Sequence, residues 1–246
     1  MIHLISDLHL TASDEALHQR FANFCSRMSD GDSLYILGDL FEYWLGDDAA
    51  EYLSHSGAKR HLAALSDRGV SLAFLAGNRD FLIGSEFLDA CQMKRLDSEH
   101  ILEVGNRRIL LMHGDSLCTD DVAHQQFRSM VLESDWQNQF LAKTIEERDA
   151  LAKMARYRSD DGKATKTAEI MDVTESAVKE AMERHNVDLL IHGHTHRPAI
   201  HQLRDNQTTR YRVVLGDWGS AESVIALTEN ELRLYFANEE LSLTLQ

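Results

Sequence analysis

Proline, cysteine and basic charge are all scarce in this sequence. It has 1 proline, 3 cysteines (Cys25, Cys91 and Cys118) and 25 Lys and Arg residues against 40 Asp and Glu, for a formal net charge of −15. An odd number of thiols forms no disulfide framework and indicates a reducing compartment. Binding to nucleic acid needs a basic surface, so the acidic balance argues against a general nucleic-acid-binding protein. We therefore predict no nucleic-acid partner.

Long apolar stretches are also missing. No run approaches 18 apolar residues, so we predict no segment that spans a bilayer. The N-terminal stretch has no basic region and Asp7 interrupts it, so we expect no signal peptide. A chain of 246 residues with 43% hydrophobic content can bury one sizeable core. We predict one domain over residues 1–246.

Short apolar runs alternate with helix-like segments in the first part of the chain. We expect strands at 1–5, 33–37 and 70–75, and helices at 15–28 and 49–68. This alternation is typical of βαβ units with strands buried on both faces. Further strands are expected at 101–104, 108–112, 187–192, 210–215, 223–227 and 231–236. The predicted fold class is α/β, with two packed sheets flanked by helices.

The pattern becomes helical after Cys118. Apolar residues such as Trp136 and Phe140 recur at helical spacing, and a helix start is expected at Asp172. We predict a helical lid insertion at about 118–166, whose end from 153 is basic within an acidic protein. Two interpretations remain open. The segment is a solvated helix end, or a lid whose apolar face holds acyl chains and whose basic rim meets phosphates or an anionic membrane.

Seven side chains that commonly bind metals stand in or just after predicted strands. They are Asp7, His9, Asp39, Asn78, His113, His194 and His196. Oxygen and imidazole donors without thiolates suit divalent ions such as Mn²⁺. Seven donors are too many for one ion, whereas two ions that share a carboxylate need about that number. The other histidines outside such a setting are predicted to be surface or core residues: His3, His18, His55, His61, His100, His124, His185 and His201.

The order of these motifs resembles the calcineurin-like metallophosphoesterase superfamily. Longer blocks at 38–48, 77–82, 113–121 and 191–198 resemble a branch of it that acts in the lipid A pathway of Gram-negative bacteria. The resemblance covers nearly the whole chain and implies a metallophosphoesterase-type two-sheet β sandwich (α/β/β/α). It also implies hydrolysis of UDP-2,3-diacylglucosamine to 2,3-diacylglucosamine 1-phosphate and UMP. Such an enzyme is expected to be peripheral on the cytoplasmic side of the inner membrane, and we predict no protein partner.

The resemblance further implies roles for individual residues. One Mn²⁺ is expected on Asp7, His9, Asp39 and His196, and a second on Asp39, Asn78, His113 and His194, with Asp39 bridging. Two adjacent cations activate a bound water for in-line attack on phosphorus. The implied catalytic residues are Arg79, Asp39 and His194. The implied substrate contacts are Asn78, Arg79, Asp121, Ser159, Lys163, Lys166 and His194, and Lys163 stands where the family pattern has asparagine.

Arg79 discriminates between kinds of substrate. Many superfamily members have histidine after the Gly-Asn motif, where it can protonate an alkoxide leaving group. Arginine stays charged and is a poor proton donor, but its guanidinium stabilises phosphate charge bidentately. Arg79 therefore favours cleavage of a diphosphate, and its alternative role is a surface salt bridge. The runner-up function is a metallophosphoesterase acting on a soluble nucleotide, either a dinucleoside polyphosphate or a cyclic nucleotide. A non-catalytic scaffold on the same fold would be expected to have lost metal ligands.

Overall fold

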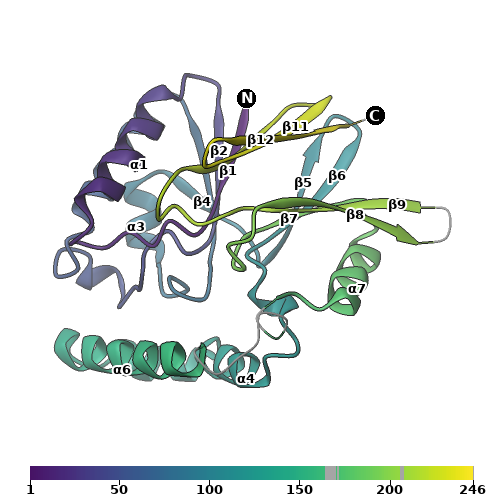
Figure 1. Cartoon of the computed structure of the whole chain (residues 1–246). Coiled ribbons are helices and arrows are strands. Elements are labelled where there is room, and N and C mark those ends of the chain that lie inside the picture. Colours follow the sequence, from purple (N-terminus) through teal and green to yellow (C-terminus); the bar gives the residue numbers. More distant parts are fainter. Residues whose placement is uncertain (164–169, 171, 206–207, 246) are drawn as a thin grey trace.

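Two sheets lie face to face in the computed structural model, which describes residues 1–163, 170, 172–205 and 208–245 (Figure 1). The first sheet has the strand order β12-β11-β10-β1-β2-β3-β4 and the second the order β5-β6-β7-β9-β8. Strands β1 to β4 run parallel to one another. The strand bounds are β1 Ile2–Ile5, β2 Ser33–Leu37, β3 Ser71–Leu75, β4 Met93–Arg95, β5 Glu99–Val104, β6 Arg107–Met112, β7 Leu189–His192, β8 Ala199–Asp205, β9 Thr208–Val214, β10 Ser223–Leu227, β11 Glu231–Phe236 and β12 Glu239–Thr244.

Helices cover the outer faces of both sheets. Helices α1 to α3 lie on the first sheet, α7 lies on the second, and α4 and α6 lie in a row at one end of the molecule (Figure 1). The helix bounds are α1 Glu15–Arg27, η1 Asp47–Ala49, α2 Ser56–Asp67, α3 Ser85–Ala90, η2 Asp115–Leu117, α4 Val122–Val131, α5 Ser134–Leu141, α6 Ile145–Lys163 and α7 Glu175–His185. The predicted arrangement of helix, sheet, sheet and helix layers is confirmed.

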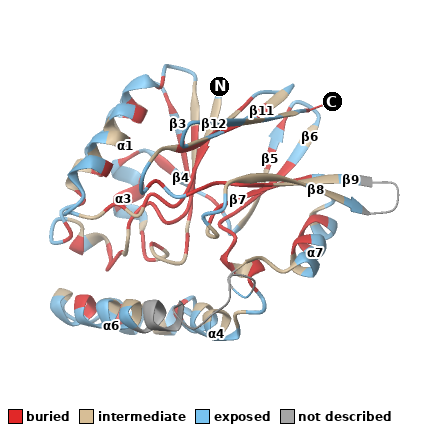
Figure 2. Ribbon diagram, in the orientation of Figure 1, coloured by how far each residue is buried: buried red, intermediate tan, exposed pale blue. Residues whose placement is uncertain are grey.

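Alternation along the strands builds two apolar cores at once. In β6, Ile109 and Leu111 pack into the cluster between the sheets, while Leu110 and Met112 pack against α7. Successive side chains of a strand point to opposite faces, so a continuous apolar run fits a strand buried on both sides. Figure 2 shows buried residues concentrated in the sheets and mostly exposed or partly exposed residues along α4 and α6.

Two predicted helix starts are displaced. The helix expected from residue 49 begins at Ser56, because Ser54 adopts a positive φ of 58° that no right-handed helix contains. The helix expected from Asp172 begins at Glu175, because the Asp172 carboxylate accepts the amide of the adjacent Val173 instead of capping a helix. Helix α3 and the strands β4, β8 and β12 were not predicted from the sequence.

Helix α6 is fastened to the core near its N-terminal end. Buried Arg148 donates to both carboxylate oxygens of Asp48, with an Nη1 to Oδ1 distance of 2.8 Å. Asp149 accepts the hydroxyls of Tyr43 at 3.0 Å and Tyr52 at 3.2 Å. The segment predicted as a lid therefore docks on the loop that follows β2. Among the described residues, no helix is long and apolar enough to cross a membrane.

Candidate metal centre

The predicted ligands come together beside the carboxyl ends of β1, β2, β3, β6 and β7. Asp7 and Asp39 stand two residues beyond β1 and β2, and His113 directly follows β6. Carboxyl ends of neighbouring strands are the usual binding edge of α/β sheets. The short gap between strand and ligand explains why side chains far apart in the sequence converge.

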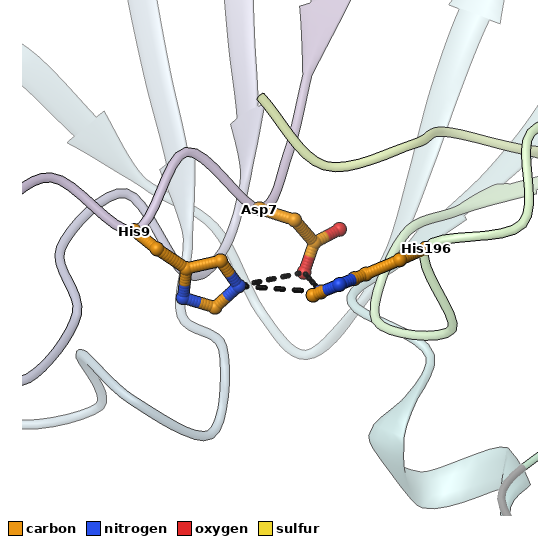
Figure 3. Close-up of side chains that lie close together, drawn as sticks. All are labelled: Asp7, His9 and His196. Carbon is orange, nitrogen blue, oxygen red and sulfur yellow. Dashed lines mark hydrogen bonds and ion pairs between the residues drawn. The ribbon is translucent and has the colours of Figure 1, made fainter. Parts of the chain in front are cut away.

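One group of donors contains Asp7, His9 and His196, which Figure 3 shows pointing toward one another. Asp7 Oδ1 lies 3.3 Å from His196 Nε2 and 3.9 Å from His9 Nε2. The two imidazole Nε2 atoms are 3.2 Å apart. Three donor atoms so close together, from the loop after β1 and the loop after β7, can share one cation.

A second group contains Asp7, Asp39 and His113. Asp39 Oδ2 lies 3.6 Å from His113 Nε2 and 4.0 Å from His9 Nε2, so this carboxylate reaches donors of both groups. Asn78 Oδ1 lies 3.0 Å from His113 Nε2. The His113 Nδ1 donates to the carbonyl of Leu37 at 2.8 Å, which fixes the ring and leaves Nε2 facing Asn78 and Asp39.

His194 enters the site differently from the other predicted ligands. Its backbone amide donates to Asp7 Oδ2 at 2.8 Å, and its ring lies 5.1 Å from the His113 ring. On its other side the ring stacks on His124 at 5.3 Å. His124, which was predicted to be a surface or core residue, thus lies beside a candidate ligand.

Backbone strain concentrates at this site. Five of the seven candidate ligands adopt positive φ angles, at 56° for Asp7, 53° for His9, 54° for Asp39, 66° for His194 and 56° for His196. Non-glycine residues rarely adopt this region, and each costs of order 1–3 kcal/mol unless the surroundings enforce it. The conformation turns each side chain away from its strand and into the common site.

Gly38 lets two of the ligand loops approach each other. A Cβ at this position, where φ is +86°, would stand 2.8 Å from His113 Nδ1 and would collide with the backbone of Gly77. Any side chain here would push apart the loops that carry Asp39 and Asn78. The Gly-Asp motif therefore serves close packing as well as the turn.

The electrostatics of the site suit a cation. Burial opposes a charge on His113, but Asp39 and Asp7 outweigh it and raise its pKa to about 9. Burial also opposes ionisation of Asp7, yet His196, His113 and His9 hold its pKa below the ordinary range. Burial lowers the pKa of His194 well below its usual value, with a contribution from the His113 charge. The ionised Asp7 carboxylate therefore stabilises positive charge at this site. A metal ion bound there would replace the proton on His113, because a histidine must be neutral to act as a ligand.

An unsatisfied polar atom supports this interpretation. Asp7 is fully buried, and its Oδ1 makes no well-formed hydrogen bond within the described part of the chain. A buried carboxylate oxygen without a donor is costly. A divalent ion fits the gap because the converging donors are carboxylate, amide and imidazole, without thiolate.

Asp80 holds the ligand loops rather than the substrate. It is fully buried, and its carboxylate accepts the amides of Gly77 at 2.9 Å and Leu40 at 2.8 Å. Burial, and then the charge of Asp39, raise the pKa of Asp80 to about 6. These bonds fix the backbone beside Asp39 and Asn78.

Glu42 is a functional candidate that the sequence analysis missed. Its Oε2 lies 3.0 Å from His9 Nδ1, and its Oε1 lies 3.7 Å from the Arg79 guanidinium and forms an ion pair with Arg156 of α6. Arg79 itself is anchored through its amide, which donates to Asp39 Oδ1 at 2.9 Å. The only signal in the sequence was the position of Glu42, three residues after Asp39.

Four of the predicted substrate contacts belong to the segment 121–166 of the sequence. Asp121 caps the N-terminus of α4, where its Oδ1 accepts the His124 amide at 3.1 Å. Ser159 and Lys163 lie in the last part of α6, of which only the backbone is described, and Lys166 lies outside the described residues. The contacts expected from the far end of the lid therefore remain predictions.

Comparisons with known proteins agree with this geometry. A family model described as calcineurin-like phosphoesterase matches residues 1–198. A UDP-2,3-diacylglucosamine hydrolase of Escherichia coli O6:H1 is 46% identical over 231 residues, which cover 94% of this chain and 96% of that protein. A protein of the same name from E. coli O7:K1 is 45% identical over the same shares. Among solved structures, vacuolar protein sorting 29 from Cryptosporidium parvum covers 99% of this chain and 97% of its own at 13% identity, and its TM-score of 0.49 supports no argument about function.

Proposed function

The chain belongs to the calcineurin-like phosphoesterase family, and we propose that it hydrolyses the diphosphate bond of UDP-2,3-diacylglucosamine. The products are 2,3-diacylglucosamine 1-phosphate and UMP. The observation that carries the proposal is the pair of donor groups joined by Asp7 and Asp39. The relatives named above, at 46% and 45% identity, support the choice of substrate.

We assign the metal sites as the motif order implies. Asp7, His9, Asp39 and His196 would hold one divalent ion, and Asp39, Asn78, His113 and His194 the other, with Mn²⁺ as the expected metal. When bound, a pair of such ions supplies activation of a water nucleophile and neutralises charge on phosphoryl oxygens. The 4.0 Å and 3.6 Å distances from Asp39 Oδ2 to His9 and His113 support a bridging role.

Arg79 acts on the phosphate charge. Its side chain is partly buried at the site and reaches Glu42, so the guanidinium is positioned beside the ligands and not on the open surface. A fixed charge there stabilises the diphosphate as negative charge builds on its oxygens. Since arginine cannot supply a proton, the leaving group must be a stable anion, as the sugar phosphate is.

The helices α4 and α6 supply the apolar surface that an acylated substrate needs. Phe140 does not belong to that surface, because it is buried and stacks on Trp136 at 5.0 Å. Apart from Tyr157, the exposed apolar side chains of these helices are Val122, Phe127, Met130, Leu151 and Met154. We propose that this surface meets acyl chains at the cytoplasmic face of an inner membrane, with the protein bound peripherally.

The decisive experiment compares substrates. Metal-free protein is reloaded with Mn²⁺, and hydrolysis of UDP-2,3-diacylglucosamine, UDP-glucosamine and a cyclic nucleotide is measured under the same conditions. We expect the acylated compound to give by far the highest kcat/KM, because each buried CH₂ contributes about 0.8 kcal/mol. Equal rates on UDP-glucosamine would reject the lipid, and preference for the cyclic nucleotide would favour the runner-up function.

A further inference from the structure

A second feature beside the metal centre is a groove of about 780 Å³. Its walls come from the segment after β1, from residues 42–55 and from one face of α6. Its volume falls in the range of about 300–1,000 Å³ that is usual for small-molecule sites. The proposed reaction assigns no role to this groove.

The groove runs directly from the candidate ligands. Leu10, which lines it, follows the ligand His9 in the sequence, and Glu42, which also lines it, lies 3.0 Å from His9 Nδ1. Arg156 stands at the same place, paired with Glu42. A molecule whose phosphate lies at the metal centre could therefore extend into the groove past Arg156.

The lining is aromatic and polar, which suits some ligands better than others. Tyr43, Tyr52 and Tyr157 contribute rings, while Thr11 and Ser13 contribute hydroxyls. Aliphatic residues are only three of the thirteen that line it. An acyl chain gains most from a dry apolar wall, whereas charged and hydroxyl groups interrupt the apolar surface of this groove, so it suits the lipid arm of the substrate less well. A planar base attached to a hydroxylated sugar matches it.

A buried histidine in the groove wall adds an unsatisfied polar group. His55 is 3% exposed, and neither ring nitrogen makes a well-formed hydrogen bond among the described residues. Its ring stacks on Trp44 at 5.7 Å. Buried polar atoms in folded proteins normally have partners, so this wall has hydrogen-bonding capacity that the protein itself does not use.

We propose that the groove binds the nucleoside of the substrate's nucleotide arm, with the base against the ring of Tyr157 and the phosphate next to Arg156. Tyr157 is 76% exposed, which is unusual for so large a ring and leaves its faces accessible. The two arms of the substrate then lie on different faces of α6. This inference rests on the proposed function, because that function supplies a substrate with a nucleotide arm.

The test measures binding of UMP and of inorganic phosphate to the Mn²⁺-loaded protein by calorimetry. Removing one base-stacking ring should weaken UMP binding by about tenfold. The affinity of Tyr157→Ala should therefore fall by this factor for UMP and stay unchanged for phosphate. Tyr157→Phe keeps the ring and should bind UMP like the wild type. Tyr235→Ala, on β11, is the matched control and should change neither ligand.

Two results would overturn the inference. One is UMP binding no tighter than phosphate in the wild type, and the other is equal UMP affinity in Tyr157→Ala and Tyr157→Phe. Kinetics on the diacylated substrate separate this inference from the function. If UDP-2,3-diacylglucosamine is hydrolysed but UMP binding does not depend on Tyr157, the groove proposal is rejected and the proposed function stands. If UMP binding depends on the ring but the lipid substrate is not cleaved, the groove proposal stands and the substrate assignment fails.

Discussion

At the scale of single residues, Glu42 links three parts of the site. It contacts the ligand His9, the cation Arg79 and, through Arg156, the lid helix α6. A carboxylate on the far nitrogen of a ligating histidine fixes the ring and raises its basicity. We therefore propose that Glu42 positions the candidate ligand His9.

Glu42→Gln keeps the shape of this side chain and removes its charge. We expect Mn²⁺ affinity to fall by about 10–100-fold, the usual effect of losing such a partner, with kcat largely restored by excess Mn²⁺. Calorimetry and metal analysis measure the affinity and the stoichiometry. Glu231→Gln, an exposed change at a residue paired with Arg233, is the control. Unchanged Mn²⁺ binding in Glu42→Gln would show that Glu42 does not position His9 and serves only to hold α6 through Arg156.

Arg79→Ala tests charge stabilisation on the diphosphate. We expect kcat to fall by an amount that corresponds to about 2–4 kcal/mol, the size of a lost oxyanion donor, with Mn²⁺ content unchanged. Arg79→Lys keeps the charge but not the planar guanidinium, so its kcat should lie between those of the wild type and Arg79→Ala. Wild-type kinetics in Arg79→Ala would leave Arg79 as a structural partner of Glu42.

The residues of the site differ in how far the sequence could reveal them. Asp7 and His9 could be predicted because a short motif and a strand end fix where they point. Glu42 and His124 could not, since their roles come from contacts with residues distant in the sequence. The positive φ angles of the ligands were also invisible, because strain depends on surroundings that hold the backbone.

At the scale of elements, α6 presents different faces to different neighbours. Arg148 and Asp149 fasten it to the core, while Leu151 and Met154 lie three residues apart and are exposed. Residues three apart are neighbours on a helix surface. The sequence predicted apolar residues at helical spacing in this segment. It could not say that Phe140 of α5 is buried and Met154 of α6 exposed, because that depends on how the helices dock.

Placing charge on this exposed stripe should weaken contact with lipid. For Leu151→Asp and Met154→Asp we expect a higher KM for the diacylated substrate and unchanged hydrolysis of a small phosphodiester. Both side chains are already exposed, so the fold should tolerate the change, and melting temperature checks this. Gln19→Asp on α1 adds the same charge elsewhere as the control. An unaltered KM would remove this face of α6 from lipid binding.

At the scale of the whole molecule, the candidate metal ligands come from the segments that follow five strands, so a metal bound there would connect the ends of these strands. Metals bound only to the folded state stabilise it by about 2.7 kcal/mol when the free ion is at 100 times its Kd. For a chain of this size that corresponds to roughly 5–11 °C in melting temperature. We therefore expect chelation to lower Tm by several degrees and abolish turnover, and Mn²⁺ to restore both.

Asp39→Ala should remove most of this Tm response, because Asp39 reaches donors of both groups. Differential scanning calorimetry with and without Mn²⁺ measures it. Full activity after exhaustive chelation would reject the metal mechanism.

Acid sensitivity of the whole fold should have a contribution from a histidine outside the metal centre. Burial lowers the pKa of His55 to about 4, whereas the unfolded chain binds this proton near 6.5. As pH falls from 6.5 to 4, His55 becomes protonated in the unfolded state but stays neutral in the folded state. The free energy of unfolding therefore falls across this window, and it stops falling on this account below pH 4. The difference between these two pKa values corresponds to about 3 kcal/mol of unfolding free energy. His55→Phe, which keeps a ring against Trp44, should flatten this part of the curve of unfolding free energy against pH. The curves of the wild type and of His55→Phe are measured by urea unfolding in the presence of chelator. Parallel curves would show that His55 is protonated as easily in the folded protein as in water.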